Sequence, residues 1–271
     1  MKKFLERNLI MVLILLGLFL LWELACTWSQ VPSYVLPKPS KIFLTLGQNL
    51  GPLLEHSWVT LLESFIGILI SVALAIFLAL FMDLNQTLRQ TLHSLLVISQ
   101  CIPSLVLAPL LMIWLGFGMA PKIVVVVLMC FYPITVNFAE GLQKLSQDSL
   151  DLLHSFGASQ LQIYRVAKIP AAIPYLFSGL RVAATYSISA AVIGEWLSSQ
   201  AGLGYYMIRV SNTYQLDKVF ACLFLIIFWS LVMNGLVALM RLLWEPGLGY
   251  IARSRHRREA KTLGLYSSPK P

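Results

Sequence analysis

The chain has 271 residues, of which 58% are hydrophobic and 12% are charged, and its formal net charge is +8. Soluble globular domains carry about 25% charged residues, so half of the usual charge is missing. This composition excludes a soluble two-layer enzyme, a disordered protein and a small secreted domain held together by disulfides. Since a membrane-spanning helix needs about 20 apolar residues, we expect an all-α membrane protein with about six transmembrane helices.

The first predicted helix covers residues 9–26. Its apolar stretch is longer than the about 7 to 15 residues of a signal-peptide core, and Glu23 places a charge near its end, so we expect no cleavage. A proline-rich segment follows at 31–40, and we expect a short surface helix to begin at Lys41, directly after Pro39. Five further spans are predicted at residues 58–81, 92–115, 123–138, 173–196 and 219–243.

These helices divide the chain into three parts. Residues 1–57 hold the first helix with its external segment and surface helix, and residues 58–243 form a five-helix core. Residues 244–271 are a basic tail. Within the core, the prolines of Ile102-Pro103 and Ala108-Pro109 are expected to break the helix predicted at 92–115.

The distribution of basic residues predicts the orientation in the plasma (inner) membrane. If the N-terminus is cytoplasmic, most basic residues fall in inner segments, and an even number of spans returns the C-terminus to the same side. The basic tail suits a lipid surface or nucleic acid as well, but orientation explains it without a further assumption, so we expect membrane lipid and no nucleic acid as partner. The inner residues are Lys2, Lys3, Arg7, Arg89, Lys144, Arg165, Lys168, Arg241, Arg253, Arg255, Arg257, Arg258, Lys261 and Lys270, and the outer ones are Lys38, Lys41, Lys122, Arg209 and Lys218.

The four cysteines, Cys26, Cys101, Cys130 and Cys222, each lie in or beside an apolar run, without a CxxC pair. We expect them to be buried as small hydrophobic residues. No histidine lies at ligand spacing beside them, so no metal site is predicted.

The long connection between the fourth and fifth spans, residues 141–170, contains many helix start and stop signals. Ser149 is the expected N-cap of a short helix, which Gly157 would end in the left-handed conformation. Such a bend would let a second helix leave at an angle.

That second helix is predicted to begin at Ser159, which has capping-box spacing to Gln162, and to end near Pro170. The two helices carry more apolar residues than a solvated connection needs. Either these side chains rest on the protein's own helix ends, or they pack into a partner. They are Leu150, Leu153, Phe156, Leu161, Tyr164 and Val166.

This segment resembles the cytoplasmic loop of permease subunits of ATP-binding-cassette (ABC) importers. The family pattern is Glu-Ala-Ala, three residues, Gly, nine residues, Ile, one residue, Leu-Pro, and the spacing from Asp151 through Gly157 to Pro170 agrees with it. The identities differ at five positions: Asp151 replaces Glu, Leu152 and Leu153 replace the alanines, Ala167 replaces Ile, and Ile169 replaces Leu.

Further segments resemble the branch of this family that includes nitrate, sulfonate, taurine and pyrimidine-precursor importers. Together with the loop they cover most of the chain in matching order. They are LPKPS at 36–40, IPSLVLAPL at 102–110, WLGFG at 114–118, SGLR at 178–181, GEW at 194–196 and GLGY at 202–205.

The resemblance implies a permease that acts as a homodimer, with a separate cytoplasmic ABC ATPase and an external or periplasmic solute-binding protein. It implies no cofactor in this chain, since ATP and Mg²⁺ belong to the ATPase. The solute would be small, either a thiamine-precursor pyrimidine or a sulfonate- or nitrate-type solute. The residues implied to couple to the ATPase are Asp151, Leu152, Leu153, Phe156, Gly157, Ala158, Ser159, Leu161, Ile169 and Pro170.

Polar residues within spans are the candidates for a translocation path, because ionisable groups are costly in lipid and usually face the protein interior or a water-filled path. Glu195 has two interpretations: it anchors the outer end of its helix at the aqueous interface, or it lies near the outer mouth of the path. The path candidates are Ser99, Gln100, Ser104, Asn137, Ser187 and Glu195.

An enzyme is not expected, because the sequence contains no GxxxxGK[ST], HExxH or GxSxG motif. The main alternative is a self-sufficient secondary transporter or channel, which should show internal symmetry and paired membrane carboxylates. We detect neither in the sequence, and this alternative leaves the helix-turn-helix connection unexplained. A membrane-embedded enzyme would need a clustered set of catalytic residues, and an assembly scaffold would need a large soluble surface. The sequence shows neither.

Overall fold

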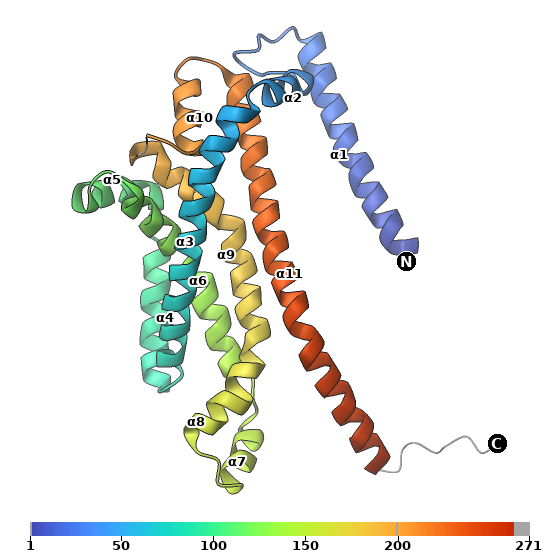
Figure 1. The fold of residues 1–271 in the computed structure, drawn as a ribbon, viewed down its shortest axis with the longest axis vertical. Helices are drawn as coiled ribbons and strands as arrows, with labels where there is room; N and C mark the ends of the chain where they lie inside the picture. The colour runs from blue at the N-terminus through green and yellow to red at the C-terminus, as the bar shows by residue number, and fades with distance from the viewer. Residues whose placement is uncertain (1, 199, 263–271) are drawn as a thin grey trace, which may run out of the picture.

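The computed structural model describes the backbone of residues 2–198 and 200–262, and the side chains of residues 9, 10, 12–196 and 200–244. Within these residues every regular element is a helix, as expected from the composition. The order is α1 (Lys2–Trp28), α2 (Pro39–Gln48), α3 (Leu50–Met82), α4 (Gln86–Gln100), α5 (Ser104–Leu115), α6 (Met119–Leu142), α7 (Gln147–Ser155), α8 (Gln160–Ile163), the π-helix η1 (Tyr164–Lys168), α9 (Ile169–Ser198), α10 (Leu203–Ser211) and α11 (Leu216–Thr262) (Figure 1).

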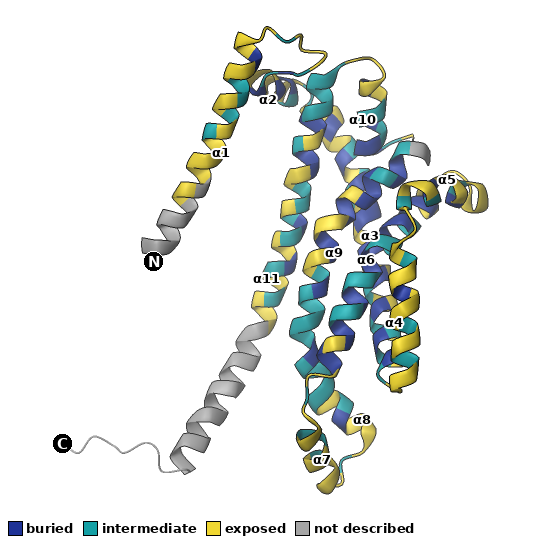
Figure 2. Cartoon of the chain, turned by 180° about the vertical axis from the view of Figure 1, so that it is seen from behind, coloured by how far each residue is buried: buried dark blue, intermediate teal, exposed yellow. Residues whose placement is uncertain are grey.

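The core is formed by α3, α6 and α9, with α11 packed along α9. Small residues allow the close approach. A Cβ atom on Gly67 of α3 would lie 2.4 Å from Cγ1 of Val126, and one on Gly179 of α9 would lie 2.6 Å from the carbonyl oxygen of Pro133. In lipid, where apolar burial gives little drive between helices, such close packing holds a bundle together. Buried residues accordingly line the inner faces of these helices (Figure 2).

Four helical stretches are long and apolar enough to cross a membrane, and the bent pair α4 and α5 makes a fifth if it counts as one span. The apolar part of α1, Val12–Trp28, is shorter. The multi-pass architecture is therefore confirmed, while the number six stays a prediction. The four stretches are Leu50–Met82, Met119–Leu142, Gln160–Trp196 and Leu216–Trp244.

The span predicted at 92–115 is two helices that meet at an angle of 91°. The break at Ile102-Pro103 is confirmed, with Pro103 directly before α5. The break at Ala108-Pro109 is wrong, because Pro109 lies inside α5. One missing backbone donor does not end an apolar helix whose other backbone bonds remain.

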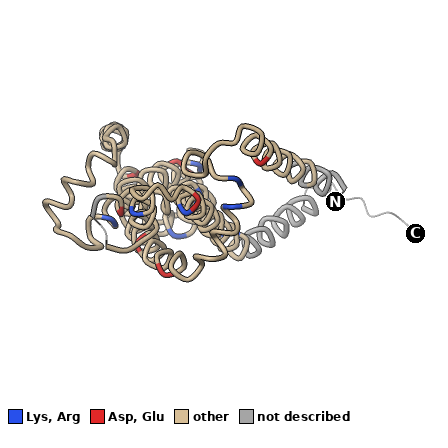
Figure 3. The backbone as a smooth tube through the Cα atoms, turned by 90° about the horizontal axis from the view of Figure 1, so that it is seen from above, with Lys and Arg blue, Asp and Glu red and all other residues tan. Residues whose placement is uncertain are grey.

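Helix α1 stands apart from the other helices except near its C-terminal end (Figures 1 and 3). There the Glu23 carboxylate accepts hydrogen bonds from the Ser40 N–H at 3.0 Å and the Ser40 hydroxyl at 2.8 Å. Ser40 is in the first turn of α2, where a carboxylate satisfies free backbone donors. This helix begins at Pro39, slightly before the predicted Lys41. Aromatic rings pack together across α1, α2 and α11, namely Phe19, Trp22, Phe43, Phe220 and Phe224.

The prediction that the cysteines are buried is confirmed for Cys26, Cys130 and Cys222. It is wrong for Cys101, which is exposed. Cys101 follows the last turn of α4 at the break before α5, so no neighbouring turn covers it. Several basic residues of the orientation argument lie outside the residues whose side chains are described: Lys2, Lys3, Arg7, Arg253, Arg255, Arg257, Arg258, Lys261 and Lys270.

Candidate functional site

The connection between α6 and α9 begins with α7, and its N-cap is Ser146. The Ser146 hydroxyl accepts a hydrogen bond from the Ser149 N–H at 3.4 Å. The predicted N-cap, Ser149, is therefore wrong by three residues. Both serines suit a cap, and the helix starts at the earlier one, which also brings Asp148 into the first turn.

The bend after α7 forms at Gly157, as predicted, with φ +76°. The Gly157 N–H donates to the His154 carbonyl at 2.8 Å, and the Ala158 N–H donates to the Leu153 carbonyl at 3.1 Å. These bonds satisfy carbonyl groups that the end of a helix leaves free. A left-handed backbone of this kind favours glycine, since it has no Cβ atom.

The second helix begins with the predicted capping box. The Ser159 hydroxyl accepts from the Gln162 N–H, and the Gln162 side chain accepts from the Ser159 N–H at 2.8 Å. The predicted end near Pro170 is wrong, because α8 continues through η1 into α9. Pro170 sits in the first turn of α9 behind the wide π turn, where its missing N–H is tolerated.

Helices α7 and α8 lie at one end of the bundle (Figures 1 and 2), and four apolar side chains of this connection are exposed. Phe156 is 78% exposed, Val166 74%, Leu161 60% and Leu152 57%. These four do not rest on the protein's own helix ends. Of the six apolar residues predicted to do so or to pack into a partner, Leu150, Leu153 and Tyr164 are partly buried. Among the other residues implied to couple, Asp151, Gly157 and Ser159 are exposed, and Leu153, Ala158, Ile169 and Pro170 are partly buried.

At its base the connection is fixed to α3 through Asp83, a residue that the sequence analysis did not single out. Its Oδ2 accepts a hydrogen bond from the Tyr164 hydroxyl at 2.6 Å. The same oxygen forms an ion pair with Lys168 Nζ at 2.6 Å. Both partners belong to η1, far along the chain from Asp83, so no local pattern could have indicated the contact.

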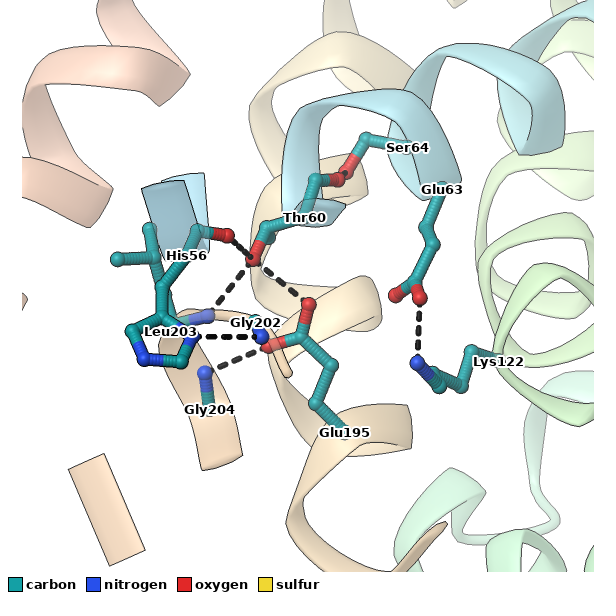
Figure 4. Close-up of polar contacts among 9 residues, drawn as sticks. All are labelled: His56, Thr60, Glu63, Ser64, Lys122, Glu195, Gly202, Leu203 and Gly204. Atoms are coloured by element: carbon teal, nitrogen blue, oxygen red, sulfur yellow. Dashed lines mark hydrogen bonds and ion pairs between the residues drawn. The ribbon is translucent and has the colours of Figure 1, made fainter. Parts of the chain in front are cut away.

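At the opposite end of the bundle, Glu195 of α9 is 1% exposed, and both of its carboxylate oxygens accept hydrogen bonds (Figure 4). One carboxylate oxygen accepts from the Thr60 hydroxyl at 2.6 Å, and the other accepts from the Gly204 N–H at 2.6 Å. Thr60 also accepts from the Leu203 N–H at 2.9 Å. Glu195 therefore holds the start of α10 against α3 from a buried position, and whether it also lies near the mouth of the path stays a prediction.

A second buried charge lies beside it: Glu63 of α3 forms an ion pair with Lys122 in the first turn of α6 (Figure 4). The Glu63 and Glu195 carboxylates are close enough to interact electrostatically. Lys122 was predicted in an outer segment, and it is buried in the first turn of α6. The proximity of the Glu63 and Glu195 carboxylates was not detected from the sequence. The ion-pair partners are 59 residues apart, so the pair has no local signature.

Residues 67–243 match the family model described as "Binding-protein-dependent transport system inner membrane component". The chain belongs to this family. It is the transmembrane permease component of an ABC importer, as the resemblance implied.

Curated relatives cover most of the permease. It is 36% identical over 88% of its length to a Haemophilus influenzae protein named "Probable ABC transporter permease protein", of which the match covers 98%. It is 32% identical over 79% of its length to the formylaminopyrimidine transport permease ThiX of Halalkalibacterium halodurans, with 86% of that protein covered.

Solved structures share the fold. A chain of the MetNI methionine ABC transporter in an inward-facing conformation matches with TM-score 0.57 and 18% identity, over 70% of the permease and 97% of that chain. A chain of an amino acid ABC transporter matches with TM-score 0.60 and 16% identity, over 73% and 96%.

The path candidates of the permease are distributed over three regions, and their role stays a prediction. Gln100 at the end of α4 is exposed and donates to the Leu128 carbonyl at 3.0 Å. Asn137 donates to the Pro133 carbonyl at 2.7 Å, and Ser187 is buried. Ser99 and Ser104 are partly buried on either side of the α4–α5 break. Glu195 and Ser187 take part in buried hydrogen bonds, since the Ser187 carbonyl accepts from the Ser64 hydroxyl at 3.2 Å. Within the described residues, no group of three or more His, Cys, Asp or Glu side chains could hold a metal ion.

Proposed function

We propose that this permease docks onto a cytoplasmic ABC ATPase through residues 151–169, here called the coupling segment. The observation that carries the proposal is the exposed apolar tip formed by Phe156, Leu152 and Leu161. Large exposed apolar side chains outside the lipid mark protein-interaction sites. Because the segment runs through η1 into α9 without a loop, force on the tip would reach a core helix directly.

In this proposal the ATPase subunits bind ATP and Mg²⁺, and this chain supplies the path and the lever. Closure of the ATPase pair would move the coupling segment, tilt the helices and expose the path outward. An external binding protein would then deliver solute, and hydrolysis would return the path to the inner side. Two copies of the permease would form the transporter, with the termini and the coupling segment in the cytoplasm.

The orientation is supported by the basic residues of the sequence as a whole. Among those whose side chains are described, the two ends carry equal numbers: Arg89, Lys144, Arg165, Lys168 and Arg241 on the coupling-segment side, and Lys38, Lys41, Lys122, Arg209 and Lys218 on the other. The excess that favours a cytoplasmic location lies in the sequence of the N-terminus and of the basic tail.

For the solute, we favour a formylated aminopyrimidine or a related pyrimidine, because the permease is 32% identical to ThiX. A sulfonate is the second candidate, since the aliphatic sulfonate permease SsuC of Escherichia coli is 27% identical over 84% of the chain. Uptake of labelled formylaminopyrimidine by cells with the complete transporter separates the two. Uptake that is competed by unlabelled pyrimidine and not by taurine or alkanesulfonates supports the first candidate, whereas no pyrimidine uptake together with uptake of a labelled alkanesulfonate favours the second.

The docking surface is tested by Phe156→Ala, with Phe117→Ala as the matched control. Both side chains are strongly exposed, at 78% and 84%, but Phe117 follows α5, away from the coupling segment. An aromatic anchor at an interface contributes at least about 2 kcal/mol, so Phe156→Ala should weaken ATPase retention by about 30-fold. Unchanged retention in Phe156→Ala, or equal loss in Phe117→Ala, would contradict docking at this tip.

A further inference from the structure

We infer that Asp83 is a positioning residue that makes α3 move together with the coupling segment, so that α3 and α9 tilt as one rigid unit. This inference rests on the proposed docking of the ATPase to that segment. It concerns what happens to the motion once docking has occurred.

The contact geometry places Asp83 where it can transmit force. Asp83 is the residue directly after α3, and its side chain is 5% exposed. One oxygen, Oδ2, binds both the Tyr164 hydroxyl and the Lys168 ammonium at 2.6 Å. Charge-assisted bonds of this kind are the stronger class of hydrogen bonds, and partial burial protects them from solvent screening.

The two partners of Asp83 are the first and last residues of η1, the π-helix through which the coupling segment continues into α9. Lys168 Nζ also lies 4.9 Å from the centre of the Tyr164 ring, so the three side chains form one cluster. Asp83 therefore connects the first and the last residue of the π turn through its own side chain. Single π turns inside longer helices are frequent at functional sites and are places where a helix can change its register. Asp83 holds this turn in its present form.

Within the described residues, these two bonds are the side-chain polar contacts that join the coupling segment to the end of α3. Directly above them, the ends of α3 and α6 and the start of α9 share an apolar cluster that includes Met82, Leu142 and Ala172. Gly141 lets α6 and α9 approach closely there, since a Cβ atom at this position would lie 2.9 Å from Ala172 Cα. Motion of η1 without α3 would have to break the Asp83 contacts at the edge of this cluster.

The opposite ends of α3 and α9 are also joined. There Thr60 of α3 donates to Glu195 of α9 at 2.6 Å, and both side chains are buried. Two helices fixed to each other near both ends cannot tilt separately unless one of these contacts opens. The structure thus assigns Asp83 the inner attachment and the Thr60–Glu195 bond the outer one.

The test measures one distance in the permease purified with its ATPase. Spin labels are placed at Trp58→Cys on α3 and Val182→Cys on α9, which are 69% and 42% exposed, in a Cys101→Ser background that removes the exposed native thiol. Labelled copies are diluted with unlabelled copies so that each measured pair lies within one chain. Distances are recorded without nucleotide and after trapping with ATP and vanadate, for the parent protein, Asp83→Asn, and the matched control Glu55→Gln, an exposed acid on α3.

In the parent protein and in Glu55→Gln we expect one narrow distance distribution that keeps its mean when ATP is trapped. In Asp83→Asn we expect the ATPase to remain bound and to hydrolyse ATP, while the distribution broadens and its mean shifts with nucleotide. The reversed pair Asp83→Lys with Lys168→Asp should restore the narrow distribution, which a loss of fold would not allow. If Asp83→Asn does not fold, Tyr164→Phe removes one of the two bonds and should broaden the distribution less.

An unchanged distribution in Asp83→Asn, or a nucleotide-dependent shift in the parent protein, would overturn the inference while leaving docking intact. A parent preparation that contains no ATPase would instead overturn the proposed function, and the inference with it. The two failures are therefore distinguishable in the same samples.

Discussion

At the scale of single residues, two glycines with positive φ serve different purposes. Gly157 has open space around its missing Cβ, so only its backbone conformation requires glycine. Gly202, with φ +113°, also has no room: a Cβ atom there would lie 2.2 Å from Cδ of Glu195. The first position controls the shape of the coupling segment, and the second allows Glu195 to hold α10.

Replacing Gly157 by Val should disrupt the left-handed turn at a cost of at least about 1–2 kcal/mol and uncouple transport while membrane insertion stays normal. Gly157→Asn is the matched control, because asparagine tolerates this backbone conformation. ATP-dependent uptake and the amount of inserted protein are measured together. Full uptake in Gly157→Val would show that the bend is not required.

Gly202→Ala should lower the thermal unfolding temperature of the detergent-purified permease, because the added methyl group displaces the Glu195 carboxylate from its buried donors. Leaving such groups unsatisfied costs about 1–3 kcal/mol. Gly51→Ala is the control. Gly51 lies in helix α3, and a Cβ atom there would meet no atom within 4 Å. If Gly202→Ala, Gly51→Ala and the parent all unfold at the same temperature, the buried Glu195 network does not stabilise the permease as described.

Which residues the sequence could reveal depended on how far apart the partners lie along the chain. The Gly157 turn and the Ser159 capping box were predicted because their partners are within a few residues. Ser146 was missed in favour of Ser149 because both satisfy the same local rule. The contact of Asp83 with Tyr164 joins residues 81 apart, and only the packed helices bring them together.

At the scale of helices, backbone breaks and buried charges decide how the elements meet. Pro103 ends one helix and starts another at 91°, whereas Pro109 leaves α5 intact. The sequence marks both prolines as possible breaks, and only the surrounding backbone bonds tell them apart. Helices α3 and α6 are joined by the ion pair of Glu63 and Lys122, whose side chains are 0% and 6% exposed.

Lys122→Met should destabilise the permease strongly, because it leaves the Glu63 carboxylate buried without its charge partner. Breaking one side of a buried pair costs about 3–5 kcal/mol, whereas replacing both members by apolar residues is often neutral. The double variant Glu63→Leu with Lys122→Met should therefore recover most of the lost thermal stability. If the double variant melts as low as Lys122→Met, the ion pair is not the origin of the loss.

At the scale of the whole molecule, the all-α membrane class followed from composition and long apolar runs, and the family from the resemblance of several motifs. The positions of the helices relative to one another did not, because a continuous apolar run does not show which face meets which neighbour. Helix α1 illustrates this limit: most of its described apolar side chains are exposed, and Glu23 and a group of aromatic rings attach it near its C-terminal end.

The central claim is that this permease works through an ATPase held at the coupling segment. Affinity purification of the tagged chain from its own membranes in mild detergent, followed by mass spectrometry and an ATPase assay, tests it most directly. We predict a stoichiometric ATPase partner that is lost when residues 151–169 are altered. A monodisperse chain without an ATPase that still moves solute in liposomes would contradict the account and favour a secondary transporter.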